Sequence, residues 1–439
     1  MILQGARHPP HRRLFVALIV TKVITASILL ALGFSHVSDD DFARIVIAQT
    51  FATRPTLDPS GTSWLPFPFW VAGATFMAVG RSLAVAKALS IAQSAVAWCV
   101  LFRAIGRDHL RAWPAWMACM IAMCLPWNVW LGATLVPEGF VGPLLAAAMI
   151  LGATPNGLAA ALLVICTLSR YESWPVALAL ASFWFVRGVR ARNLRWACFA
   201  LLALLGPLAW ATWNQHAHGD ALHFFARVSR YRQSLHLAPL ALAERIAVYP
   251  SAVVSVMGPF ACVGLGAVPA LAIVETRKLW RVPLALALIQ LVTLIAGELA
   301  DGAPTHHPER AVLAFVIVLI AAGVSGWVSL FTTFTKRRSL RQMFFVGAAA
   351  ALAIYGGAWI IHEIHEFPGR GESDTRQVQL SRGRSLVRTE RYRVTPCSYE
   401  HFALIAAFGR PEQVAIDTPS LRTPPTAACP KLVRLSAGE

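Results

Sequence analysis

The chain is a succession of apolar segments separated by short polar stretches. The first, from about Leu14 to Phe34, has the roughly 20 apolar residues that an α-helix needs to cross the hydrocarbon core of a bilayer. Hydrophobic residues make up 56% of the sequence and charged residues 14%, and the mean hydropathy is +0.57. A soluble domain has no use for so much apolar surface, so lipid surrounds most of this chain. We expect an all-α polytopic membrane protein.

The same hydropathy pattern predicts the later spans. They are expected at about Leu83–Phe102, Ala112–Trp130, Phe140–Gly152, Leu158–Leu168, Trp174–Val186, Trp196–Trp213, Ser251–Val274, Val282–Ala296, Ala311–Phe331 and Met343–Ile361. Several are short or interrupted by proline, and with the first span they make about eleven crossings.

Basic residues set the orientation of these spans. Lys and Arg number 39 against 22 Asp and Glu, which gives a net charge of +17. In a membrane protein this excess marks cytoplasmic loops, so no nucleic-acid partner is expected. A cytoplasmic N-terminus and an extracytoplasmic C-terminus put three basic clusters inside: Arg187–Arg195, Arg277–Arg281 and Lys336–Arg341. The basic start could open a signal peptide, but no convincing cleavage site follows, and we expect a retained helix in a bacterial inner membrane.

The apolar segment Trp64–Gly80 decides this topology. Its helical part is only about 14 residues, which is short for a span, so we expect it to lie in the membrane interface. Counting it as a crossing would invert every later loop and put the basic clusters outside.

The sequence predicts two regions, a transmembrane domain over residues 1–361, with an outer loop at about 35–81, and a small extracytoplasmic α/β tail over 362–439. In the tail we expect strands at Tyr392–Thr395 and Val414–Ile416, and a helix from Tyr399 to Phe408 capped by Ser398. Cys397 and Cys429 could pair in an oxidising compartment, or remain free buried thiols.

Three consecutive acids follow the first span, Asp39, Asp40 and Asp41. Grouped carboxylates can raise one another's pKa or share a cation, and either arrangement makes a base or a metal site. The alternative is a helix N-terminus, with Ser38 as the cap and the acids against the helix dipole. A cap needs one or two acids, so the third indicates a site.

Other charged residues are expected on the outer side as well. Glu138 and Glu172 stand at helix ends, where ionisable groups at membrane depth are functional candidates. For Glu172 an ion pair with Arg170 is the simpler account. Glu138 has no neighbouring base in the sequence, so it needs a cation or a partner on another loop, or else is a solvated helix start.

Four basic residues are candidates for binding phosphate: Arg230, Arg232, His307 and Arg310. Arginine and protonated histidine match phosphate oxygens. The alternatives are a solvated loop for the first two and interfacial snorkelling for Arg310. Adjacent His306 and His307 cannot share a helical face, so they do not make a zinc pair.

Taken together, these features resemble the GT-C superfamily of membrane glycosyltransferases, which includes protein O-mannosyltransferases (glycosyltransferase family 39), aminoarabinose transferases and Rgt-type transferases. Residues 39–42 resemble the acidic pair that heads the first outer helix of that family. Trp64–Phe69 looks like its segment rich in proline and aromatic residues, and 168–172 resembles the turn after its fifth span. This sequence has three acids where the family has two, and it lacks the His-Pro-Pro form.

The resemblance implies sugar transfer from a polyprenyl-phosphate donor at the outer leaflet, usually with inversion. The acceptor would be a lipid, a glycan or a protein. Asp40 is predicted to be the base, with Asp39 the second choice and Asp41 a helper or cap. Glu138, with Glu172 and Arg170, would position the acceptor or a divalent metal, Mg²⁺ or Mn²⁺.

Two alternatives lie outside this class. One is a transporter or flippase of a lipid-linked or small polar substrate, which would carry charged or broken helices at mid-membrane in paired positions. The charges here gather at one face, which disfavours it. The other is a catalytically silent partner subunit whose acids only cap a helix.

Overall fold

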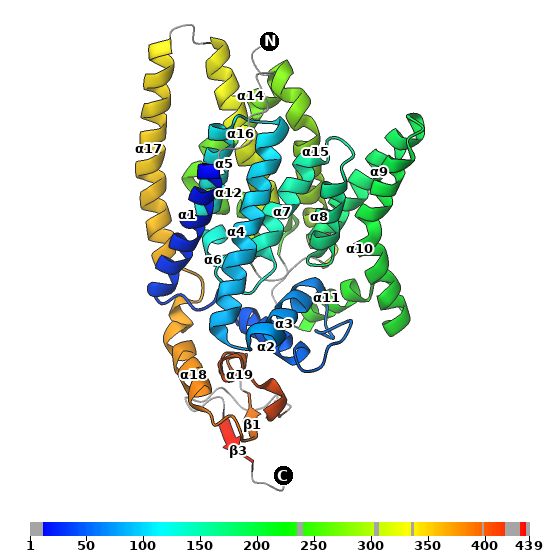
Figure 1. Ribbon diagram of the computed structural model, residues 1–439, viewed down its shortest axis with the longest axis vertical. Coiled ribbons are helices and arrows are strands. Elements are labelled where there is room, and N and C mark those ends of the chain that lie inside the picture. The colour runs from blue at the N-terminus through cyan, green and yellow to red at the C-terminus, as the bar shows by residue number, and fades with distance from the viewer. Residues whose placement is uncertain are drawn as a thin grey trace.

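The structure is a computed structural model that describes residues 12–234, 240–302, 307–334, 338–396, 399–417 and 431–435. Helices dominate it, as the sequence predicts, and most run along one direction to form a bundle (Figure 1). The bundle helices are α1 (Arg12–Ala31), α4 (Leu83–Asp108), α5 (Ala112–Cys124), α6 (Pro126–Leu131), α7 (Glu138–Leu151), α8 (Gly157–Thr167), α9 (Trp174–Arg190), α10 (Leu194–His218), α12 (Leu242–Met257), α13 (Ala261–Gly264), α14 (Ala267–Ala272), α15 (Val274–Leu299), α16 (Leu313–Phe334) and α17 (Arg338–His365).

Within the described residues, six stretches are long and apolar enough to cross a membrane: Arg12–Ala31, Leu83–Arg107, Leu194–His218, Leu242–Gly264, Val274–Leu299 and Leu313–Thr333. Shorter apolar helices, including α5, α7 and α8, pack between them. An integral membrane protein follows from these helices, while the number of eleven crossings stays a prediction.

Two predicted spans are divided, and proline and glycine explain both breaks. Ala112–Trp130 is split because Pro126 begins α6 and Leu125 before it is extended, with ψ 137°. Ser251–Val274 breaks at Gly258, whose φ of 48° suits glycine, and Pro259 follows.

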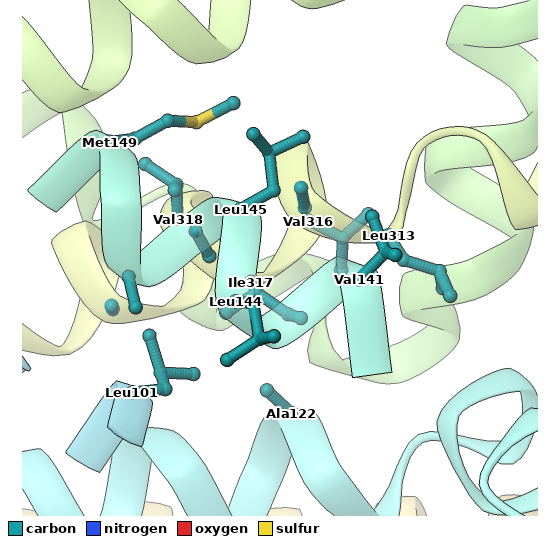
Figure 2. Packing of buried hydrophobic residues seen from close by; sticks show 14 of the residues in the cluster. Leu101, Ala122, Val141, Leu144, Leu145, Met149, Leu313, Val316, Ile317 and Val318 are labelled. Carbon is teal, nitrogen blue, oxygen red and sulfur yellow. The ribbon is translucent and has the colours of Figure 1, made fainter. Parts of the chain in front are cut away.

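The bundle core forms where α7 packs against α16. Val141, Leu144 and Leu145 of α7 face Leu313 and Ile317 of α16 (Figure 2). Every residue of α7 is buried, including Glu138 at its start. Apolar contact along this helix therefore holds that one carboxylate at the end of the bundle.

Three further helices lie at the lower end of the bundle in Figure 1: α2 (Asp39–Phe51), α3 (Phe67–Val79) and α11 (His223–Ser234). Helix α3 lies beside α2 at the ends of the longer helices, an arrangement that fits the interfacial position predicted for Trp64–Gly80. The basic connection between α9 and α10 lies at the opposite end (Figure 1).

The C-terminal region packs below α2 in the same view. It contains α18 (Ser373–Ser385), β1 (Tyr392–Thr395), α19 (His401–Phe408), β2 (Val414–Ile416) and β3 (Lys431–Arg434). Strand β1 is central, parallel to β2 and antiparallel to β3.

Both predicted strands are confirmed, whereas α18 and β3 were not predicted. The predicted helix begins at His401 instead of Tyr399, because Tyr399 and Glu400 form a turn before it. Cys397, Cys429 and Ser398 lie outside the described residues.

A second apolar core joins this region to α2 and α3. Phe42 and Ile45 of α2 cluster with Phe69 of α3 and with Leu404 of α19. The amide of Gln49, which is fully buried, donates to the carbonyl oxygen of Ala406 at 2.9 Å. These contacts fix α2 between the bundle and the C-terminal region.

Candidate functional site

The three consecutive acids at the start of α2 point in three directions, because successive residues of a helix are turned by about 100°. Asp39 makes a bidentate pair with Arg376 of α18, with both N–O distances 2.7 Å. Asp40 is exposed. Asp41 is 2% exposed and faces the bundle. Only the third acid is thus buried beside the ends of the membrane helices.

Ser38 occupies the N-cap position of α2 but makes no side-chain cap bond, so the alternative in which its hydroxyl caps the helix does not hold. The hydroxyl instead accepts a hydrogen bond from Nη2 of Arg310 at 3.1 Å. Asp41 closes the turn from within the helix, since its Oδ2 accepts the backbone N–H of Val37 at 2.7 Å. Asp41 therefore serves as a cap with one oxygen.

The other oxygen of Asp41 remains available. Oδ1 lies 3.5 Å from Nη2 of Arg310 and has no hydrogen-bond partner among the described residues. Burial raises the pKa of the Asp41 carboxyl, although the nearby Arg310 guanidinium opposes the rise. A buried carboxylate with a raised pKa, one oxygen of which accepts no hydrogen bond from the described residues, is suited to accept a proton.

Arg44 is the residue whose importance the sequence analysis missed. It is 5% exposed, and its guanidinium lies 4.2 Å from the centre of the Trp64 ring. In the described part of the chain it has no ion pair, and its Nε is buried without a hydrogen-bond partner. Burial lowers the pKa of Arg44. The sequence did contain a signal for it: Arg44 follows Asp41 by three residues in a largely apolar helix, and this spacing puts the two side chains on one face.

Glu138 and Glu172 share one cation. Arg170 approaches Glu138 at 2.8 Å through Nη1 and Glu172 at 2.6 Å through Nε. The predicted Arg170–Glu172 pair is confirmed, and Glu138 has its partner on another loop. A side chain at Gly139 would overlap the carbonyl oxygen of Leu131, so glycine there lets α7 approach α6.

The two groups form one charged cluster, defined here as Asp41, Arg44, Glu138, Arg170, Glu172 and Arg310. Glu138 is close enough for its charge to act on both Asp41 and Arg44, and Arg310 acts on the same two residues. One oxygen of Glu138 and the Nε of Arg310 are buried without hydrogen-bond partners among the described residues. Such unpaired buried atoms are costly unless a ligand satisfies them.

Replacing Arg170 by methionine should destabilise the protein by about 3–5 kcal/mol, because Glu172 would stay buried without the cation it pairs with and Glu138 would lose its nearest one. The side chains of Glu138 and Glu172 are 2% and 8% exposed. Thermal and denaturant unfolding of the detergent-solubilised protein measure this. The matched control is Arg81→Met, which breaks the more exposed pair with Glu412 and should cost about 0–1 kcal/mol. Equal losses in the two variants would contradict the buried pairing.

The remaining predicted phosphate ligands lie apart from the charged cluster or have other partners. Arg230 is exposed on α11. Arg232 makes a bidentate pair with Glu298, at 2.7 and 2.6 Å. His307 packs against Trp127, with ring centres 5.5 Å apart, and His306 lies outside the described residues. The structure brings only Arg310 of this set next to the acids of α2.

The fold and the charged cluster define a class of polytopic membrane protein with buried ionic groups gathered at one end of an apolar bundle. No family model matches the chain, and no curated protein matches it. Among solved structures, ArnT from Cupriavidus metallidurans bound to undecaprenyl phosphate is similar, with a TM-score of 0.57 at 13% identity over 92% of this chain and 89% of that one. The apo structure of the same protein gives a TM-score of 0.51, again at 13% identity, over 90% and 89%.

ArnT is an aminoarabinose transferase of the GT-C family. At this level of identity the likeness concerns the fold, and it covers most of both chains. The predicted resemblance to GT-C membrane glycosyltransferases is therefore confirmed as a resemblance of fold.

Proposed function

We propose that this protein is a membrane glycosyltransferase that moves a sugar from a polyprenyl-phosphate carrier to a hydroxyl-bearing acceptor. One observation carries the proposal: the charged cluster holds a carboxylate oxygen of Asp41 and the Nε atoms of Arg44 and Arg310 buried without hydrogen-bond partners among the described residues. A site of this kind suits a ligand that combines an anion with a transferable proton. The ArnT structure with bound undecaprenyl phosphate supports a lipid phosphate as that anion.

The guanidiniums of Arg44 and Arg310 would bind the phosphate. Arg44 presents a buried cation that has no ion pair among the described residues, and stacking on Trp64 fixes the plane of its guanidinium. Arg310 is held by Ser38 at the start of α2. Preorganised cations in a site with little water stabilise the charge that develops on a leaving phosphate.

The proposed reaction is a single displacement. Oδ1 of Asp41 takes the proton of the acceptor hydroxyl while the acceptor oxygen forms a bond to the anomeric carbon. The bond from that carbon to the phosphate oxygen breaks, and its electron pair leaves with the polyprenyl phosphate. Attack opposite the leaving group inverts the anomeric configuration.

The geometry favours Asp41 over Asp40 as the base, although Asp40 remains the prediction from the sequence. Asp40 is exposed, so water competes for its oxygens, and Asp39 is bound by Arg376. Asp41 alone among the three contacts a cation of the charged cluster and keeps a free buried oxygen.

A divalent metal, Mg²⁺ or Mn²⁺, stays a prediction from the sequence. Because Oδ1 of Asp41 is the proposed base, the oxygen of Glu138 that has no hydrogen-bond partner among the described residues is the hard ligand that would hold it. When bound, such an ion would supply positive charge to the leaving phosphate.

The proposed site faces the extracytoplasmic side. The charged cluster and the basic α9–α10 connection lie at opposite ends of the bundle (Figure 1), and basic connections are retained in the cytoplasm. This orientation puts the donor in the outer leaflet and the C-terminus outside.

The direct test uses the purified full-length protein in liposomes that contain an undecaprenyl-phosphate donor with a radiolabelled sugar, aminoarabinose or mannose. Bacterial membrane fractions supply the acceptor. We expect label in a lipid, glycan or protein fraction and an equal amount of released undecaprenyl phosphate. Absence of release, together with uptake of a polar solute in liposomes without donor, would instead support a transporter.

The rate of transfer should depend on pH through Asp41. Because burial raises its pKa, the carboxylate needed as a base is lost at a higher pH than a free aspartate, whose pKa is about 3.9. We expect kcat/KM to fall as the pH is lowered through this raised pKa. The pH–rate profile measures it, and an acid limb at the ordinary aspartate value would contradict the assignment.

A further inference from the structure

A second group of potential ligands lies on the other side of the α2 N-terminus. It contains His36 from the turn before α2, Asp39, and Glu372 from the turn that leads into α18. One nitrogen or oxygen atom from each lies within 4.8 Å of the other two. The three residues come from two regions of the chain that are more than 300 residues apart.

The imidazole of His36 is the main evidence that a ligand binds here. The residue is 0% exposed, and its Nε2 has no hydrogen-bond partner among the described residues. Its Nδ1 lies 2.7 Å from the hydroxyl of Ser35, so the tautomer in which Nδ1 donates to Ser35 leaves the Nε2 lone pair free. Nε2 lies 3.9 Å from an oxygen of Glu372.

The buried Nε2 of His36 faces two carboxylates, which cannot donate a hydrogen bond to its lone pair when they are ionised. Without another partner, this nitrogen costs free energy in the folded state.

Arg376 already orients both carboxylates. Its guanidinium donates to the two oxygens of Asp39 at 2.7 Å and to Glu372 at 3.1 Å. Each carboxylate has about four lone-pair sites, so these bonds leave acceptor capacity on both. In metal sites, ligating carboxylates are commonly held by such outer hydrogen bonds.

We propose that His36, Asp39 and Glu372 bind a zinc ion that joins the first outer loop to the C-terminal region. One imidazole and two carboxylates are a three-ligand set with the fourth position open to water. The imidazole selects zinc over magnesium, which prefers oxygen ligands only. Glu372 is 59% exposed, and a small rotation of its side chain would bring it closer to Nε2 while Arg376 keeps its two bonds to Asp39.

This site would serve the structure instead of the transfer reaction. It engages Asp39, whereas the proposed base is Asp41 on another face of α2. Zinc there would tie α18 to the helix that carries the charged cluster. Zinc binding at this site can therefore be tested separately from sugar transfer.

The test is zinc binding to the chelator-treated, full-length protein in detergent. Calorimetric titration should show one Zn²⁺ per chain, and added Zn²⁺ should raise the Tm, whereas Mg²⁺ at the same concentration should not. Cobalt(II) in place of zinc should produce visible d–d absorption. Glu372→Gln and His36→Gln should each weaken zinc binding by at least about tenfold.

The matched control is Glu366→Gln, which makes the same chemical change in the same connection but at a residue that pairs with Arg370. It should bind zinc like the unmodified protein. Absence of stoichiometric zinc binding in the unmodified protein would overturn the proposal. Unchanged affinity in both Glu372→Gln and His36→Gln would overturn it as well.

Discussion

Asp41→Asn should reduce the rate of sugar transfer by about 10²–10⁴-fold, the range that a general base contributes. The amide keeps the size of the side chain, and its oxygen can still accept the N–H of Val37. It cannot take a proton from the acceptor hydroxyl. The measurement is the rate of label transfer from the undecaprenyl-phosphate donor at saturating concentration.

The stability of this variant separates a lost base from a lost fold. The pKa of Asp41 is higher in the folded state than in the unfolded chain. The free energy of unfolding therefore falls as the pH rises from the unfolded-state pKa to the folded-state pKa. Above both values, the ionised carboxylate of Asp41 is unfavourable in the folded protein. Asparagine removes this cost but also takes the ion pair away from Arg310, so we expect the Tm at pH 7 to change little.

Asp40→Asn is the matched control for Asp41→Asn, because it makes the same change one residue away on an exposed side chain. It should keep most of the transfer activity. If Asp40→Asn abolishes transfer and Asp41→Asn does not, the sequence-based choice of Asp40 is the correct one and the structural argument for Asp41 fails.

Arg44→Met should lower kcat/KM by about 10²–10³-fold, similar to the loss of one preorganised donor to a developing anion. Methionine fills the space beside Trp64 but offers no cation to the phosphate. Because Arg44 is buried and has no ion pair among the described residues, its removal should not lower the Tm. Loss of activity with retained stability is the pattern expected for a ligand-binding charge.

Two comparisons complete this experiment. Arg44→Lys keeps the charge without the planar guanidinium, so it should retain part of the activity. Arg54→Met removes an exposed arginine just beyond the same helix and should leave transfer unchanged. A large fall in Tm for Arg44→Met would show that Arg44 supports the fold, and full activity would remove it from the phosphate site.

The secondary structure was predictable where the signal is local. The interfacial helix that begins at the acids, the short apolar helix after Trp64 and strand β1 all follow from runs of adjacent residues. Helix α18 was not predicted, because its Ser- and Arg-rich sequence has no apolar periodicity; Leu380 is its buried residue in the second core. The strand β3 was not predicted either.

The charged cluster was predictable only in part. The Arg170–Glu172 pair lies within one turn, so adjacency sufficed to propose it. Arg376 donates hydrogen bonds to Asp39, which lies 337 residues earlier in the sequence, and Arg310 donates to Ser38, 272 residues earlier. No local sequence pattern predicts such contacts. Arg44 was overlooked because a lone arginine near the membrane is usually solvated, and its burial depends on Trp64.

The sequence by itself determined that this is a membrane protein, because its apolar segments have bilayer length, and its basic loops predict which end of the bundle faces the cytoplasm. Tertiary structure alone decided the roles of the three acids, by giving Asp39 an arginine, leaving Asp40 in water and burying Asp41. The physical reason is that transfer of a segment into lipid depends on its own residues, whereas the state of a carboxylate depends on whichever charges the fold places beside it.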